Sequence, residues 1–124
     1  MIKIKVFRKK QFPSYLVPFY IVLNMTKEEF TKAINNGEDI CAYPIKSGEE
    51  IILNVPNSST TLFAINSNFR NTKIYPFKIS NEVQINQNIV LQLEQTKFFK
   101  TVEIKICQIE DKPINIKKVK EYNL

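Results

Sequence analysis

The chain has 124 residues, of which 44% are hydrophobic and 24% are charged, and 18 basic residues against 12 acidic ones give a net charge of +6. This composition is typical of one globular domain large enough to bury a core without disulfide staples, and it gives no sign of disorder. The sequence contains no histidine and only two glycines, Gly37 and Gly48. Histidine-dependent nucleophiles, histidine metal sites and glycine-rich nucleotide loops are therefore excluded.

The N-terminal segment alternates lysine with isoleucine and lacks the apolar run of a signal peptide, and no stretch reaches the ~20 apolar residues of a membrane helix. We therefore expect a cytoplasmic protein without membrane insertion. Cys41 and Cys107 belong to no C-x-x-C pair. We expect both to be reduced thiols, buried at strand positions, because no histidine is present to activate them.

Two strands are predicted at the start of the chain. Apolar residues alternate with lysine from Ile2 to Phe7, as in a half-buried strand. A second apolar segment runs from Phe19 to Asn24, and the prolines that precede it, Pro13 and Pro18, mark where pairing begins because proline donates no ladder hydrogen bond.

One short helix is predicted from Lys27 to Asn35. Thr26 and Glu29 have the spacing of a capping box, and Met25 stands where it packs on Phe30 as a hydrophobic staple. The Asn35-Asn36-Gly37 sequence is a good left-handed stop. The helix has one apolar stripe, formed by Phe30, Ala33 and Ile34.

After Gly37 the pattern returns to strands, with turn residues at intervals of roughly 8–15 positions. Strands are predicted at Ile40–Tyr43, Glu49–Val55, Thr60–Asn66, Tyr75–Ile79, Val83–Ile85, Ile89–Leu93 and Val102–Ile106. This order predicts an all-β fold, an antiparallel β-sandwich of the immunoglobulin or PEGA-like kind with one short inserted helix. We expect its core to contain Ile4, Val6, Ile21, Leu53, Leu62, Leu91 and Ile104.

The domain is expected to span residues 1–110. Residues 111–124 form a lysine-rich C-terminal segment, in which Ile114, Ile116 and Val119 have the alternation of a short edge strand. The pattern leaves two alternatives open, a strand docked on the sheet edge and a frayed tail.

The stretch from Gly48 to Ile65, preceded by two strands and a proline-containing connection, resembles the small PEGA-like β-sandwich modules of bacteria. The resemblance covers about residues 2–65. Asn57-Ser58 stands where those modules have a glycine turn, and residues 25–47, with the helix, replace a tight hairpin. The resemblance implies a non-catalytic attachment or interaction domain, with no catalytic residue to carry over.

Two binding functions are compatible with this sequence. The first is an interaction module that binds a protein partner, by edge-strand addition or through the helix region around Thr31. The second is a nucleic-acid-binding module that uses lysine-rich segments at the two chain ends and a stacking aromatic, since one of Phe98 and Phe99 lies outside the core if both are in a strand. The candidate contacts are Lys5, Arg8, Lys9, Lys10, Thr31, Phe99, Lys117 and Lys118.

A solvated surface, with lysines that protect edge strands from aggregation, explains the same basic residues. Arginine is limited to Arg8 and Arg70, so protein binding is favoured over nucleic-acid binding. An enzyme is the least favoured class, because the acidic pairs Glu28-Glu29 and Glu49-Glu50 have ordinary roles at a helix start and beside a strand. No cofactor and no metal site are expected.

Overall fold

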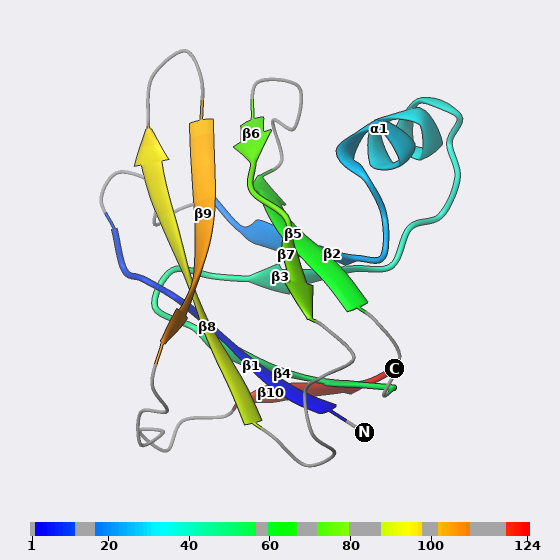
Figure 1. Ribbon diagram of the computed structural model, residues 1–124. Coiled ribbons are helices and arrows are strands. Elements are labelled where there is room, and N and C mark those ends of the chain that lie inside the picture. Colours follow the sequence, from blue (N-terminus) through cyan, green and yellow to red (C-terminus); the bar gives the residue numbers. More distant parts are fainter. Residues whose placement is uncertain are drawn as a thin grey trace.

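The computed structural model describes residues 2–11, 17–56, 60–66, 72–79, 88–97, 102–109 and 119–124. Within these ranges the chain forms two sheets and one helix (Figure 1). The elements in chain order are β1 (Ile2–Arg8), β2 (Phe19–Leu23), α1 (Lys27–Asn35), β3 (Ala42–Ile45), β4 (Glu50–Val55), β5 (Thr60–Asn66), β6 (Thr72–Ile74), β7 (Phe77–Ile79), β8 (Asn88–Lys97), β9 (Val102–Ile109) and β10 (Lys120–Asn123).

Six strands form one sheet in the order β10-β4-β1-β8-β9-β6, and four form the other in the order β3-β2-β5-β7. The prediction of a mainly β fold with two sheets and one helix is confirmed. Pairing is not purely antiparallel, however, because β1 with β8, β10 with β4 and β6 with β9 run parallel. Side-chain alternation is the same in both kinds of pair, so the sequence pattern does not distinguish them.

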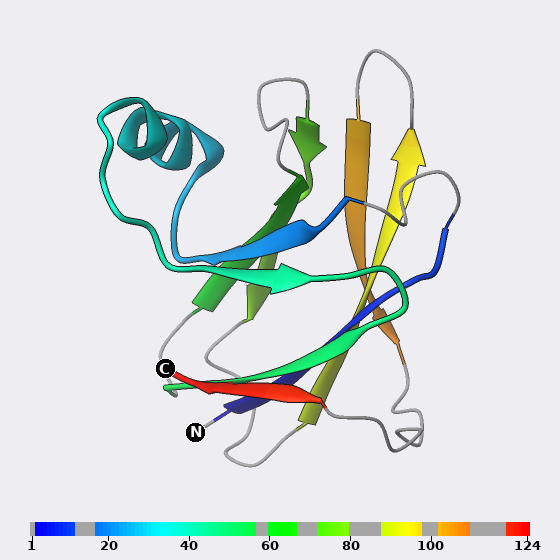
Figure 2. The same ribbon diagram turned by 180° about the vertical axis from the view of Figure 1, so that it is seen from behind.

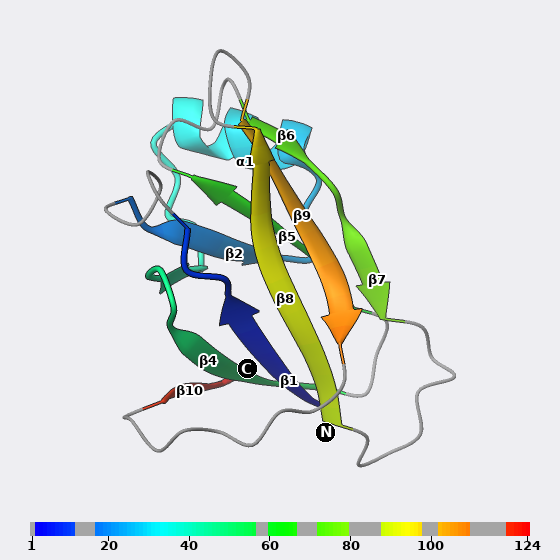
Figure 3. The ribbon, with the colours of Figure 1, turned by 90° about the vertical axis from the view of Figure 1, so that its left-hand side faces the viewer.

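The two sheets meet along one side of the molecule. The short segment of residues 72–79 lies beside β9 (Figure 3) and contributes one strand to each sheet. Its first strand, β6, pairs with β9 in the large sheet, and its second, β7, pairs with β5 in the small sheet. On the other side, β1 and β10 lie on either side of β4, and the two ends of the chain are close together (Figure 2).

The core lies between the sheets. Alternate residues of β1, Ile2, Ile4 and Val6, are buried there, while the lysines between them are half-exposed. The prediction of the core is confirmed, since all of its residues are 0% exposed: Ile4, Val6, Ile21, Leu53, Leu62, Leu91 and Ile104.

The bounds of α1 agree with the predicted helix. The Glu29 amide donates to Thr26 Oγ1 at 3.1 Å and the Thr26 amide donates to Glu29 Oε1 at 3.1 Å, which completes the capping box. Gly37, with φ +70°, follows the C-cap as expected. Phe30 packs edge-on against Phe63 of β5, with 5.9 Å between ring centroids.

The small sheet is buried on both faces. Its inner face joins the main core, and its outer face packs against α1 through Val22, Phe63 and Ile65, each at most 1% exposed. Met25 packs against this same group, as a staple would. The described molecule therefore has three layers, which are the large sheet, the small sheet and the helix.

Several local predictions are wrong. β3 runs from Ala42 to Ile45, two positions later than the predicted strand Ile40–Tyr43, and so contains Pro44; proline is tolerated because β3 is an edge strand. Cys41 and Cys107 are exposed, the first just before β3 and the second in β9, where its side chain faces away from the core. The predicted strand Val83–Ile85 lies outside the described residues.

The C-terminal segment ends in a strand on the edge of the large sheet. β10 starts one position after Val119 and pairs parallel with β4, and the Leu124 amide continues the ladder by donating to the Asn54 carbonyl at 2.9 Å. Ile114 and Ile116 lie outside the described residues.

Candidate interaction surface

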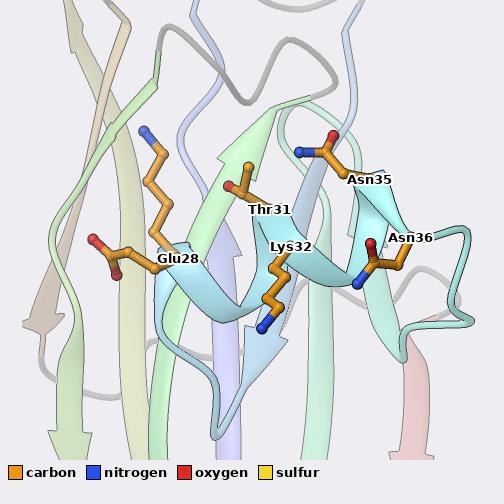
Figure 4. A pocket seen from close by; sticks show the side chains of 6 residues that line it. Glu28, Thr31, Lys32, Asn35 and Asn36 are labelled. Atoms are coloured by element: carbon orange, nitrogen blue, oxygen red, sulfur yellow. The ribbon is translucent and has the colours of Figure 1, made fainter.

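The helix α1 turns a polar side away from the sheet that it covers. Phe30 and Ala33 are buried beneath it, so the opposite side carries exposed residues. A hollow of about 670 Å³ follows this side, and Figure 4 shows the polar side chains that spread from the helix around it. Together with Ile34, the residues that line the hollow are called here the α1 surface: Lys27, Glu28, Thr31, Lys32, Asn35 and Asn36.

Thr31 lies in the middle of one flank of this surface. Lys27, Thr31 and Ile34 are spaced by four and three residues, so they form one row along the helix. Ile34 was predicted to be part of the buried stripe, but it is 41% exposed, because only the centre of the stripe, at Phe30 and Ala33, meets the sheet. The α1 surface is thus mostly polar and charged, with Ile34 as its one exposed apolar side chain.

A second hollow, of about 570 Å³, lies at the N-terminal end of α1. It separates the helix start from the segment that joins β6 to β7, and it shares Lys27 and Glu28 with the first hollow. Apolar, polar and charged residues line it: Asn24, Met25, Thr26, Lys27, Glu28, Glu29, Thr61, Lys73, Ile74 and Pro76.

The structure brings the two chain ends near each other, and two lysines of the N-terminal segment are paired with acids. Lys3 Nζ is 4.0 Å from Glu121 Oε1 of β10, and Lys9 Nζ is 3.2 Å from Glu94 Oε1 of β8. These pairs are exposed and add little stability. They do reduce the positive charge that this side of the large sheet presents.

The other predicted contacts at the chain ends are dispersed. Lys10 is exposed beyond the end of β1, and Lys5 is half-buried on the side of β1 that faces away from the core. Phe99, Lys117 and Lys118 lie outside the described residues.

Arg8 differs most from its prediction, because its side chain is only 1% exposed. Its Nη1 donates to the carbonyls of Val17 at 2.7 Å and Ile45 at 2.9 Å, and its guanidinium carbon lies 3.5 Å from the ring centroid of Phe19. Burial lowers the pKa of Arg8 to about 10, so the group is still a cation at neutral pH. The Arg8 side chain therefore links β1 to the segment before β2 and to the end of β3, and its buried position keeps it from contacting a partner.

A third hollow, of about 320 Å³, lies where the ends of several strands of the two sheets meet. Tyr43 of β3 lines it and also contacts Tyr122 of β10, with 4.7 Å between ring centroids. Desolvation raises the pKa of Tyr43, and the neighbouring Cys41 and Tyr122 add to the rise. The lining residues carry no charged side chain: Leu23, Asn24, Cys41, Tyr43, Val55, Pro56, Thr60 and Leu124.

One group of residues was missed at the level of sequence. Lys73 Nζ and Lys105 Nζ lie 5.6 and 5.5 Å from the ring centroid of Tyr75. The two lysines are far apart in the chain and meet through the parallel pairing of β6 with β9, which local periodicity does not predict.

Among the described residues, no three cysteine, aspartate or glutamate side chains gather as a metal site requires. The described part of the chain also contains no helix with the length and hydropathy needed to cross a membrane. Comparison with known proteins found no matching family model, no matching curated protein and no matching solved structure.

Proposed function

We propose that this chain is a non-catalytic cytoplasmic module that binds a protein partner through the α1 surface. The observation that carries the proposal is the placement of the helix. β2 and β3 pair directly as antiparallel neighbours, a connection that a turn of two to five residues makes in most hairpins. Here residues 24–41 join them instead, and they leave a helix on the outside of the molecule.

The helix has a packing role, since it covers Val22, Phe63 and Ile65 of the small sheet. Packing accounts for its inner side only. Its outer side carries the largest of the three hollows, and Ile34, which is 41% exposed, gives the helix one apolar side chain that a protein partner can cover. The resemblance of residues 2–65 to PEGA-like modules, which are non-catalytic interaction domains, supports the same function.

Binding through the helix is favoured over edge-strand addition. The β3 edge contains Pro44, which has no amide hydrogen to donate to an added strand. The β10 edge is four residues long and carries Lys120 and Glu121, and charges on a short edge discourage pairing with another chain.

The chain-end lysines support the nucleic-acid alternative less than their sequence suggested. Lys3 and Lys9 face carboxylates at 4.0 and 3.2 Å, and Arg8 is buried. A protein gains affinity for nucleic acid when its lysines contact phosphates and thereby release counterions. Lysines that are already paired with acids contribute less to this affinity.

The test is affinity capture from the native lysate followed by mass spectrometry, with and without nuclease. Wild-type protein is compared with Thr31→Arg and Lys32→Glu, which change the α1 surface. Lys46→Glu is the matched control, because Lys46 is also an exposed lysine and follows directly after β3. The turn between β3 and β4 lies away from α1 (Figure 2). We expect a protein captured by the wild type and by the control, with or without nuclease, and lost with both helix variants.

Two results would overturn the proposal. Capture of the same proteins by all four forms would show that α1 is not the contact. Capture that disappears with nuclease would place nucleic acid between the bait and its preys, in favour of the alternative function.

A further inference from the structure

We propose that Lys73, Tyr75 and Lys105 form a binding site for single-stranded nucleic acid. None of the three belongs to the α1 surface, although Lys73 lines the second hollow together with Lys27 and Glu28. Tyr75 follows directly after β6, and Lys105 lies in β9. β6 pairs with β9 in parallel, with Lys73 opposite Glu103 and Ile74 opposite Ile104, so the next step of the same register sets Tyr75 beside Lys105. The two ammonium nitrogens lie 5.6 and 5.5 Å from the centroid of the half-exposed Tyr75 ring, and both lysines are exposed.

Lys73 has no carboxylate of the described residues within 4.0 Å. Its cross-strand neighbour, Glu103, is engaged elsewhere, since its carboxylate accepts a hydrogen bond from Thr96 at 3.1 Å and lies 3.4 Å from Lys97 Nζ. Burial alone raises the pKa of Glu103, but the hydrogen bonds of Thr96 and Lys97 and the charges of Lys97 and Lys73 outweigh it and hold that pKa below its ordinary value. Lys73 thus acts on Glu103 from a distance and keeps its own donors available.

Lys105 is in a similar position. It stands opposite Glu94 in the β8–β9 ladder, yet it too lies beyond 4.0 Å of any described carboxylate. The Glu94 carboxylate lies instead 3.2 Å from Lys9 Nζ and accepts a hydrogen bond from it. Two exposed cations therefore lie beside one aromatic ring, neither paired with a described carboxylate, so both can bind an anion.

The ring selects among anions. A cation–π contact at an exposed site is weak, so the lysines can leave Tyr75 and reach phosphate oxygens. The half-exposed ring then offers a face on which an unpaired base can stack, and such stacking tolerates every base. An acidic peptide satisfies the lysines but makes no use of the ring, and a duplex keeps its bases stacked inside, so a single strand fits the group best.

The test measures binding of a fluorescently labelled single-stranded oligonucleotide by anisotropy, over a series of salt concentrations starting from about 50 mM, at which counterion release still favours binding. Wild-type protein is expected to bind the single strand more tightly than a duplex of the same length. In the double variant Lys73→Gln/Lys105→Gln, log K should fall less steeply with log salt, with a slope smaller in magnitude by about 1.4, since each contact to a single strand contributes roughly 0.7. Tyr75→Leu should weaken binding about tenfold, while Tyr75→Phe, which keeps the ring, should not.

Controls separate this site from general charge and from the α1 surface. Lys46→Gln/Lys120→Gln removes the same charge from exposed positions elsewhere and should leave the slope nearly unchanged, and so should Thr31→Arg. Circular dichroism and a thermal melt confirm that each variant is folded. The proposal fails if the control pair lowers the slope as much as the Lys73/Lys105 pair does. It also fails if Tyr75→Leu binds like the wild type, or if an aspartate-rich peptide of equal charge binds with the same affinity.

Discussion

Replacing Arg8 by methionine tests whether a buried cation holds β1 to the segments before β2 and after β3. Methionine keeps much of the volume but removes the donors to the carbonyls of Val17 and Ile45 and the contact with the Phe19 ring. A buried carbonyl left without a donor costs about 1–3 kcal/mol, and a desolvated cation–π contact is worth about 2 kcal/mol. Methionine also avoids the desolvation that lowers the Arg8 pKa, which offsets part of the loss.

We expect a net loss of about 3 kcal/mol for Arg8→Met, measured as a lower midpoint of urea unfolding with an unchanged slope. With a slope of about 1–3 kcal/mol per molar urea, the midpoint should fall by roughly 1–3 M. Arg8→Lys keeps the charge but not the planar stack, so its loss should be intermediate. Lys10→Met, at an exposed neighbour, should change little. A loss below about 0.5 kcal/mol for Arg8→Met, the range of ordinary surface substitutions, would refute the reasoning.

Three further predictions concern the core, the helix and pH. Ile104→Ala should destabilise the protein by about 2–5 kcal/mol in urea unfolding, and a loss under about 0.5 kcal/mol would contradict its burial at 0% exposure. Phe30→Ala should lower the free energy of unfolding by about 3–5 kcal/mol, because Phe30 loses its contact with Phe63. Thr31→Arg should leave the melting temperature within a few degrees. If Phe30→Ala does not change stability and the amides of α1 exchange rapidly, the helix is not docked. Since the pKa of Glu103 is lowered on folding, its contribution should be present above about pH 4.5 and lost as the pH falls through the folded pKa; equal acid sensitivity of Glu103→Gln and wild type would contradict this.

The helix and the core residues could be predicted because their signals are local. The reciprocal spacing of Thr26 and Glu29 and the glycine at position 37 define both ends of α1 without reference to the rest of the chain. The order of the strands could not be predicted in this way. Alternation shows which side of β1 is buried. It does not show which strands lie next to β1, and these are β4 and the distant β8.

The candidate sites also differ in whether a local sequence pattern or long-range strand pairing determines them. Thr31 was predicted as a contact residue of the helix region, and it lines the hollow beside α1. Arg8 was predicted to be on the surface because it begins the basic run Arg8-Lys9-Lys10, whereas alternation along β1 sets it on the buried side with Ile4 and Val6. The group around Tyr75 depends on the pairing of β6 with β9, so no local pattern pointed to it.

The position of β1 in the large sheet also affects how the chain is made. β1 is synthesised well before β8, one of its two partners, because Lys3 pairs with Asn88, 85 positions later. At roughly 5–20 residues per second, that strand is synthesised about 4–17 s after β1. During this time the hydrogen-bonding edge of β1 that faces β8 in the finished sheet has no native partner, and contacts of such sequence separation also slow refolding. Emergence of β8 is therefore the event that allows the large sheet to close, and chains stalled before residue 88 should be the aggregation-prone ones.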